Sequence, residues 1–306
     1  MKSKKTSPRR TKRQGKKKKS NRLLIPLGLL LLVVTSLLAT GYFVFLRPGP
    51  IVEKSTPAVV PSYMSPDEQK APAPIKQLVP SEMSINPLKP QIAIIIDDMG
   101  YQKATGDALL EMDLDLTFSF LPHAPNAANQ AQKAQELGRD ILLHLPLEPS
   151  DPTWNLGPGG LYLSMNREEL TATFAKDLAV VPMAVGINNH MGSLFTENET
   201  SMRTLLEIIK SKELFFLDSL TSSQSVGYDI ARSLGIKTAK RNVFLDNEHE
   251  NKKVGSQLLE LVALAEQQGY AIGLAHPFPS TLAALKEHEG ILRSRVELVG
   301  VSKLVQ

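Results

Sequence analysis

The chain has 306 residues, 42% of them hydrophobic, and a formal net charge of +4. Twelve of its 35 Lys and Arg residues lie in residues 1–22, which contain no Asp or Glu, so that 23 basic and 31 acidic residues remain elsewhere, a net charge of −8. An acidic body argues against nucleic acid as a substrate, and the absence of cysteine excludes a disulfide framework and a thiolate metal site.

The basic segment 1–22 is followed by residues 23–46, which carry no charged side chain. As a helix this segment would be about 36 Å long, enough to cross a bilayer. Because basic residues beside a span stay in the cytoplasm, we predict a cytoplasmic tail that contacts anionic lipid headgroups, a single transmembrane helix and an external C-terminal domain. The alternative is a signal peptide cleaved near Ala39-Thr40-Gly41.

Proline dominates the next segment. Ten of the 21 prolines lie between Arg47 and Pro90. Such a composition buries no core and favours an extended, disordered spacer. Residues 47–89 are therefore predicted to be a linker that holds the following domain away from the membrane.

Residues 90–306 show the alternation of apolar runs and helical patterns that is typical of βα units and a mostly parallel sheet. Seven strands are predicted, at residues 92–96, 116–121, 140–143, 184–187, 214–217, 237–239 and 271–275. Helices are predicted at residues 103–112, 124–138, 166–181, 198–212 and 253–268, with a further short helix after residue 219.

The first strand has the clearest pattern, because the apolar run I-A-I-I-I ends in Asp97, Asp98, a methionine and a glycine. A short, fully apolar run is typical of a strand buried on both faces. Open α/β sheets and barrels place their chemistry at the carboxyl ends of their strands. Adjacent strand residues point to opposite sides, so the two carboxylates are expected to serve different roles.

Polar residues also follow the later apolar runs, and they share this position at the predicted carboxyl ends. The full set is Asp97, Asp98, His144, His190, Asp218, Arg241 and His276. The remaining histidines differ. His249 and His288 lie in charged runs typical of a solvated surface. His123 could lie with the polar residues at the carboxyl ends of the strands or in a loop.

One carboxylate and two imidazoles, from Asp98, His144 and His190, form a ligand set suited to zinc or a similar divalent ion. Asp97 is then placed to accept a proton from the attacking water, and His276 to protonate a leaving group. In the alternative interpretation His144 and His190 are rim histidines with local hydrogen bonds. Ser193 and Ser219 leave a serine hydrolase open, although neither lies on a nucleophile elbow.

At this point the motifs resemble a known family. I-I-I-D-D-M-G, L-L-H-L-P-L-E-P, G-I-N-N-H-M-G-S, F-L-D-S and L-A-H-P occur in this order within about residues 90–300. Together they resemble the divergent polysaccharide deacetylases, a branch of the NodB-like deacetylases of carbohydrate esterase family 4. The resemblance implies a distorted (β/α) barrel with seven strands and a metal-dependent N- or O-deacetylase of cell-envelope glycans.

The resemblance also assigns roles. Asp97 corresponds to the catalytic base, Asp98 to the metal carboxylate and His276 to the general acid. The wider superfamily has a second histidine four residues after the first, where this chain has Glu148 after His144. Either Glu148 replaces that imidazole or His190 supplies it, and we favour His190. Substrate contacts are expected from Glu148, Asn188, Asn189, Asp218 and Arg241.

The sequence therefore predicts a membrane-anchored, extracytoplasmic hydrolase that uses a divalent ion such as zinc to deacetylate a cell-envelope polysaccharide, peptidoglycan or another amino-sugar polymer. Two alternatives remain. One is a non-catalytic protein of the same fold that binds glycan or organises the envelope. The other is a metal-dependent amidase or esterase with a different acyl substrate, selected by loops such as residues 150–163.

Overall fold

The computed structural model describes residues 89–306. The predicted tail 1–22, the predicted transmembrane helix 23–46 and nearly all of the predicted linker 47–89 lie outside the described residues, so these remain predictions. None of the helices between residues 89 and 306 combines the length and the hydropathy that a bilayer crossing needs.

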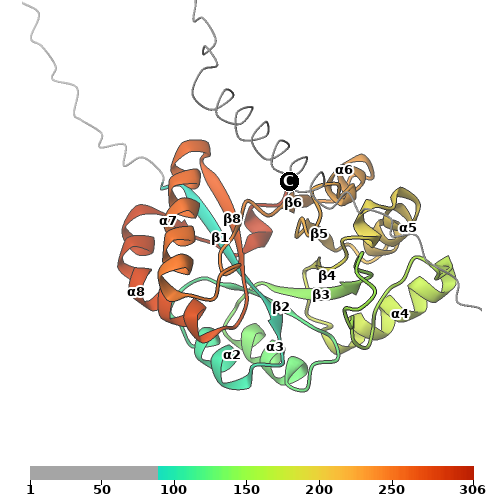
Figure 1. Ribbon diagram of the computed structural model, residues 1–306, viewed down its shortest axis with the longest axis horizontal. Coiled ribbons are helices and arrows are strands. Elements are labelled where there is room, and N and C mark those ends of the chain that lie inside the picture. Colours follow the sequence, from blue (N-terminus) through green and yellow to red (C-terminus); the bar gives the residue numbers. More distant parts are fainter. Residues whose placement is uncertain (1–88) are drawn as a thin grey trace, which may run out of the picture. The chain divides into compact units, whose positions relative to one another are not determined.

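The described residues alternate strands with helices (Figure 1). The strands are β1 (Gln91–Met99), β2 (Thr117–Phe120), β3 (Ile141–Leu147), β4 (Gly186–Met191), β5 (Phe215–Asp218), β6 (Thr238–Lys240), β7 (Val243–Phe244), β8 (Tyr270–Ala275) and β9 (Glu297–Leu298). The helices are α2 (Lys103–Leu110), α3 (Ala127–Glu136), α4 (Arg167–Val180), α5 (Glu199–Lys210), α6 (Gly227–Ser233), α7 (Asn251–Gln268) and α8 (Pro279–Arg295), with 3-10 turns η1 (Phe195–Glu197) and η2 (Val301–Lys303).

All strands belong to one parallel sheet in the order β6-β5-β4-β3-β2-β1-β8-β7, with β9 paired to β1. Each of the seven predicted strands has a counterpart, whereas β7 and β9, of two residues each, were not predicted. Within residues 89–306 no ladder joins β6 to β7. The sheet curls, with helices outside it (Figure 1). Because β6 and β7 are not paired, the sheet stays open and does not close into the seven-stranded barrel that the resemblance implied.

Strand β1 shows why a continuous apolar run is needed at the centre of this fold. Ile92, Ile94 and Ile96 pack into the main core between the sheet and the helices. Ala93 and Ile95 face a second, smaller core inside the curl, together with residues of β5, β8 and η2. Both faces of β1 are buried, as predicted from the sequence.

Two helix ends follow their sequence signals. Asn166 and Glu169 form the predicted reciprocal capping box at the start of α4, and α7 ends at Gly269, whose φ of 94° lies in the left-handed region that glycine tolerates. Helix α8, which begins with Pro279 and packs beside α7, was not predicted, although proline at the first helical position is a recognised start signal.

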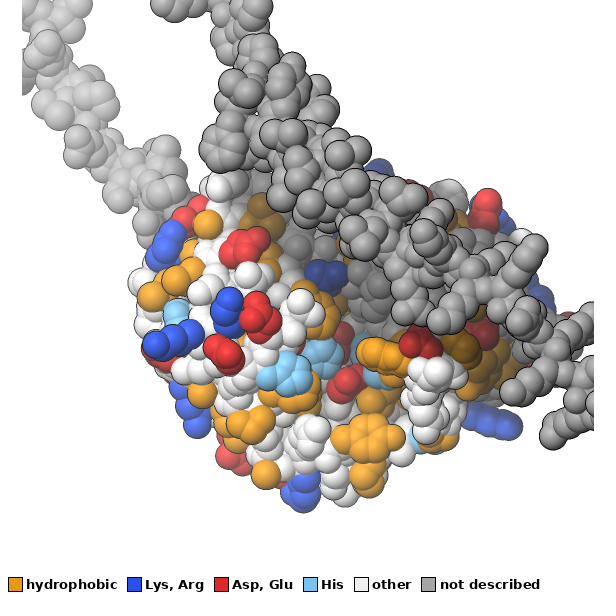
Figure 2. Space-filling view, in the orientation of Figure 1, with side chains coloured by type: hydrophobic (Ala, Val, Ile, Leu, Met, Phe, Trp, Pro, Cys, Tyr) orange, Lys and Arg blue, Asp and Glu red, His pale blue; other side chains and the backbone are white. Residues whose placement is uncertain are grey.

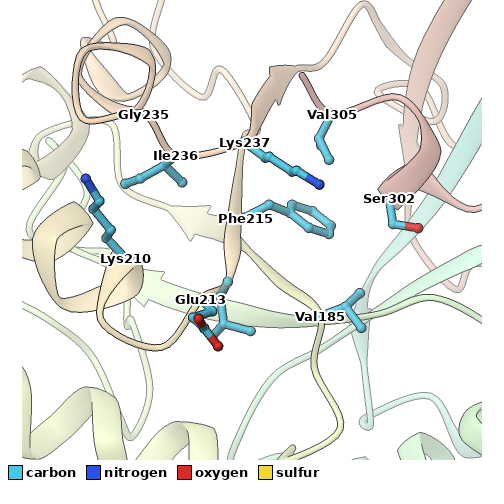
Figure 3. Close-up of a pocket in the computed structure, with 10 residues that line it drawn as sticks. Val185, Lys210, Glu213, Phe215, Gly235, Ile236, Lys237, Ser302 and Val305 are labelled. Carbon is cyan, nitrogen blue, oxygen red and sulfur yellow. The ribbon is translucent and has the colours of Figure 1, made fainter.

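A cavity of about 390 Å³ lies at the amino ends of β4, β5 and β6 (Figure 3). Val185 and Phe215 line it together with the charged side chains of Lys210, Glu213 and Lys237. A second and larger cavity lies at the carboxyl ends of β1, β3, β4 and β8, where several of the polar residues singled out in the sequence gather.

Candidate active site

The larger cavity, of about 680 Å³, lies at the carboxyl ends of β1, β3, β4 and β8. Its polar lining includes Asp97, Asp98, His144, His190, Asp246 and His276. Figure 2 shows histidine side chains beside acidic and hydrophobic side chains on this face of the molecule. The curl of the parallel sheet thus brings together segments that are more than a hundred residues apart in the sequence.

The end of β1 departs from regular strand geometry. The register between β1 and β2 shifts between Ile96 and Met99, and Asp98 adopts a left-handed backbone with a φ of 53°. A bulge of this kind changes the direction of a side chain. Asp97 and Asp98 therefore both line the cavity, and the expectation that they point to opposite sides was wrong. Such backbone strain is frequent at functional sites.

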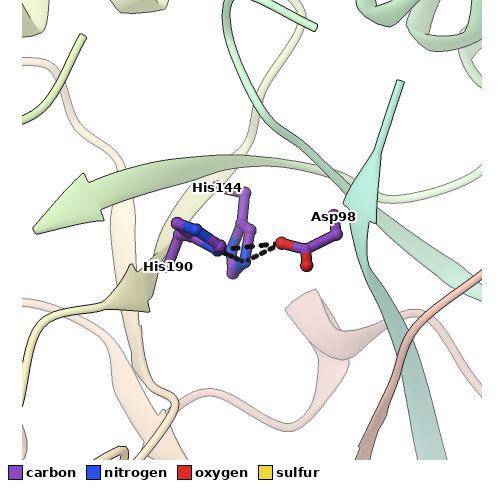
Figure 4. A group of neighbouring side chains, drawn as sticks. All are labelled: Asp98, His144 and His190. Atoms are coloured by element: carbon purple, nitrogen blue, oxygen red, sulfur yellow. Dashed lines mark hydrogen bonds and ion pairs between the residues drawn. The ribbon is translucent and has the colours of Figure 1, made fainter. Parts of the chain in front are cut away.

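Asp98, His144 and His190 lie close together, from three different strands (Figure 4). Asp98 Oδ1 lies 3.1 Å from His144 Nε2 and 2.9 Å from His190 Nδ1. The two ring nitrogens are 3.3 Å apart. Ligand atoms held about 2.0–2.1 Å from a tetrahedral zinc ion are separated by roughly 3.3 Å. The three atoms therefore have the spacing of ligands on one ion.

The chemistry of the three groups also fits a cation. Asp98 Oδ1 is buried and has no hydrogen-bond partner of good geometry among residues 89–306. Burial alone would raise the pKa of Asp98, but His144 and His190 outweigh it and hold that pKa below its usual range. An ionised oxygen that faces two ring nitrogens at 2.9–3.1 Å is a ready ligand for a cation shared by the three groups. A divalent ion would be such a cation.

Asp97 lies beside the three ligand candidates and is only 3% exposed. Its Oδ1 accepts a hydrogen bond of 2.8 Å from Asn188 Nδ2 and lies 3.8 Å from His144 Nδ1. Burial raises the pKa of Asp97 above its usual value. A carboxylate whose pKa moves toward neutrality is better matched to the work of a general base.

His276 follows β8, the strand that pairs with β1, and also lines the cavity. Its Nε2 is 3.8 Å from Asp98 Oδ2, and its Nδ1 pairs with Asp246 Oδ1 at 3.0 Å. Asp246 is buried, and its Oδ2 accepts hydrogen bonds from the His276 backbone N–H and from Thr281 Oγ1. Burial acts to lower the pKa of His276, but the carboxylates of Asp246, Asp98 and Asp97 outweigh burial and raise this pKa to about 9. The ring is therefore protonated at neutral pH, with Nε2 facing the cavity.

Of the five predicted substrate contacts, Asn189 lines the cavity. Its Oδ1 accepts from the Ser219 N–H, and its Nδ2 donates to Met191 O and Thr221 Oγ1. Asn188 is completely buried, and all of its side-chain hydrogen bonds are internal.

Glu148, Asp218 and Arg241 lie outside the cavity lining. Glu148 Oε2 accepts from the Leu163 N–H, which fixes the loop between β3 and α4. Asp218 Oδ2 accepts from the Tyr228 N–H in the first turn of α6. Arg241 donates to the backbone oxygens that follow β5. Glu148 is occupied in this loop and is not part of the cluster. The second imidazole of the cluster belongs to His190, the option favoured from the sequence.

The serine alternative lacks a base. Ser193 Oγ accepts from Ser150, and Ser219 Oγ accepts from Asn188. Among the hydrogen bonds of residues 89–306, neither hydroxyl pairs with a histidine. An activated serine nucleophile needs such a neighbour.

Sequence reasoning missed several residues of the cavity. Asp246 follows β7, which is too short to show a periodic pattern. His249, expected at the solvated surface, is exposed but stacks on Phe278 at 4.2 Å and lines the cavity. Trp154, the only tryptophan, forms part of another wall and is 60% exposed. Trp154 lies in loop 150–163, which was expected from the sequence to select the acyl group, although the tryptophan itself was not singled out as a site residue.

Comparison with known proteins gives a consistent result. Residues 94–305 match the family described as divergent polysaccharide deacetylase. An uncharacterised protein of Haemophilus influenzae is 35% identical over 214 residues, which cover 70% of this chain and 76% of the relative. The uncharacterised protein YibQ of Escherichia coli K12 is 33% identical over 215 residues, covering 70% and 67%. A solved structure of an uncharacterised Agrobacterium tumefaciens protein, 26% identical, superposes with a TM-score of 0.68 over 71% of this chain and 90% of its own.

Proposed function

This chain belongs to the divergent polysaccharide deacetylase family, and from that premise we propose that it is a metal-dependent hydrolase that removes acetyl groups from a cell-envelope polysaccharide. The observation that carries the proposal is the cluster of Asp98, His144 and His190, whose three ligand atoms lie 2.9–3.3 Å from one another. One carboxylate and two imidazoles form a ligand set that suits zinc or a similar divalent ion.

When bound, the ion would polarise the acyl carbonyl and increase the acidity of the attacking water. The remaining chemistry belongs to the side chains. Asp97 takes the proton from the water as its oxygen attacks the carbonyl carbon. His276 gives its Nε2 proton to the departing amine or alcohol as the bond from that carbon breaks. Water is thereby added across one amide or ester bond, and the products are acetate and a free sugar amine or hydroxyl.

The two catalytic groups have different electrostatic surroundings. His276 is held protonated by Asp246, with its pKa raised to about 9. Asp97 has a pKa raised by burial, yet it accepts a hydrogen bond from an amide, which favours its ionised form. Asp97 and His276 follow paired residues of the neighbouring strands β1 and β8, and both line the cavity beside the ligand cluster, so an acid and a base are available at one site.

We also propose that the domain works outside the cytoplasm, anchored by residues 23–46 and spaced from the membrane by residues 47–89. The support for this part is the charge-free apolar segment, the basic segment before it and the proline-rich composition after it. An amino-sugar polymer such as peptidoglycan is a substrate that a membrane-tethered hydrolase would reach there.

The test uses the full chain, purified in detergent. Elemental analysis measures its metal content, and acetate release is followed from acetylated chitooligosaccharides and from peptidoglycan, with and without a chelator. We expect about one divalent ion per chain and acetate release that the chelator stops. A metal-free protein that binds these glycans without releasing acetate would overturn the proposal in favour of a non-catalytic glycan-binding protein. Release of a different acyl group would point to an amidase or esterase.

A further inference from the structure

Asn188 connects the ligand cluster to the proposed base. It lies on β4 directly opposite His144 on β3, because the two residues are partners in the ladder between these strands. Its side chain is completely buried. An amide shielded from solvent in this way cannot contact a polysaccharide, so the predicted substrate contact at Asn188 has no geometric support.

The orientation of the Asn188 amide is fixed by its neighbours. Its Oδ1 accepts from Ser119 Oγ at 2.5 Å and pairs with His144 Nδ1 at 2.9 Å. Its Nδ2 donates to Asp97 Oδ1 at 2.8 Å and to Ser219 Oγ at 3.3 Å. In the flipped orientation the amide oxygen would face the Asp97 carboxylate, which has no proton to donate when ionised. Only the present orientation satisfies all four contacts.

This orientation determines where His144 carries its proton. Because Asn188 Oδ1 is only an acceptor, His144 Nδ1 must be the donor. A neutral imidazole with a proton on Nδ1 has its free lone pair on Nε2, and Nε2 is the nitrogen that lies 3.1 Å from Asp98 Oδ1. The hydrogen bond thus presents His144 in the form that a metal ion binds.

We propose that Asn188 is a positioning residue with two separable functions: its oxygen sets the tautomer of His144 for metal binding, and its nitrogen holds the carboxylate of Asp97 for proton transfer. The inference rests on the metal site of the proposed function and adds to it a residue that touches neither the ion nor the substrate. It also explains why a polar side chain lies at a completely buried position of β4, where an apolar residue would be expected in a parallel sheet.

Two substitutions separate the functions. Asn188→Asp keeps an oxygen that accepts from His144 but places a carboxylate against Asp97 in place of the amide donor. Asn188→Ala removes both contacts. Loss of a hydrogen-bond partner behind a metal-binding histidine typically weakens metal affinity by about 10–100-fold. We therefore expect Asn188→Ala to bind zinc about 10–100-fold more weakly, and Asn188→Asp to bind within a few-fold of the unsubstituted protein.

Zinc affinity is measured by titration of the full chain after removal of metal, with thermal denaturation of the metal-free proteins recorded in parallel. Ser119→Ala is the matched control, since it removes the other hydrogen bond to Asn188 Oδ1 and leaves those to His144 and Asp97 in place. Its zinc affinity should stay near that of the unsubstituted protein. A role for Asn188 in packing alone would lower thermal stability without separating the zinc affinities of the Asp and Ala variants.

The proposal is overturned if Asn188→Ala binds zinc as tightly as the unsubstituted protein, or if Asn188→Asp loses zinc to the same extent as Asn188→Ala. Should Asn188→Ala fail to fold, the Asp variant alone decides, because a folded Asn188→Asp protein without zinc contradicts the tautomer argument. In turnover, Asn188→Asp should lower kcat with little change in KM. A protein that binds zinc as expected but releases no acetate would refute the deacetylase function and leave the tautomer argument standing.

Discussion

Cavities lie at both ends of the curled sheet, and their linings differ in kind. The cavity at the amino ends of β4–β6 holds Lys210, Glu213 and Lys237 among apolar side chains (Figure 3). The cavity at the carboxyl ends holds Asp and His side chains packed against one another at hydrogen-bonding distances. In a parallel sheet the carboxyl ends of all strands lie on the same side. One polar residue at the end of each apolar run is therefore enough to assemble a site.

The largest effect is expected from removal of one ligand from the cluster of Asp98, His144 and His190, which only the cavity at the carboxyl ends contains. Asp98→Ala, or His190→Ala, takes one of three ligands away, and we expect loss of bound zinc and a fall in activity of about 10³-fold or more. Lys237→Ala, in the cavity at the amino end, is the control and should retain metal and activity. Metal content and acetate release decide the matter, and zinc retained in both ligand variants would contradict the ligand assignment.

The second prediction concerns the residue that the sequence did not reveal. Asp246→Asn leaves the ligand cluster intact but removes the charge that holds His276 protonated and oriented. We expect kcat to fall by about 10²-fold with metal content and KM nearly unchanged, because only the proton donor is affected. Steady-state kinetics at fixed zinc provide the measurement. An unchanged kcat would show either that His276 donates its proton without help from Asp246 or that His276 is not the proton donor.

The third prediction follows from the two pKa shifts. His276 must be protonated to act as the acid, and its pKa is raised to about 9, so kcat should decline above roughly pH 9. Asp97 must be ionised to act as the base, and burial raises its pKa, so kcat should also decline toward acid pH. In Asp246→Asn the alkaline limb should move to lower pH, whereas Lys237→Ala should keep the profile of the unsubstituted protein. A profile without an alkaline limb would exclude His276 as the acid.

The smallest expected effect comes from a histidine and aspartate pair away from both cavities. His123 Nε2 lies 2.8 Å from Asp177 Oδ1, and Asp177 Oδ2 is buried without a hydrogen-bond partner among the described residues. Burial raises the pKa of Asp177 to about 6, although His123 opposes the shift. The carboxyl group of Asp177 loses its proton near pH 4 in the unfolded chain but only near pH 6 in the folded protein. The free energy of unfolding therefore falls as pH rises from about 4 to 6 and stays lower above that range.

Asp177→Asn removes this dependence. We expect a gain of about 1 kcal/mol in the free energy of unfolding near pH 7, a smaller or absent gain near pH 4, and no change in zinc content or kcat. Denaturant unfolding at the two pH values tests the expectation. A loss of stability at neutral pH would mean that the ion pair with His123 outweighs the burial of the carboxylate.

Much of this arrangement was predictable because it depends on strand ends. Asp98, His144 and His190 each follow an apolar run, and the parallel order of those runs brings them to one edge. The bulge at Asp97 and Asp98 was not predictable, since it arises from a register shift against β2. Asp246 was missed because β7 is only two residues long. The role of Asn188 depends on which side chain lies opposite it on β3, and a one-dimensional pattern does not contain that pairing.

Trp154 gives the cavity an intrinsic optical reporter. Trp154 is the only indole in the chain, it is largely exposed, and it lines the cavity. Light absorbed at the long-wavelength end of the protein spectrum therefore excites a single chromophore whose emission depends on its contact with water. Occupancy of the cavity can therefore be followed by intrinsic fluorescence in the unlabelled protein.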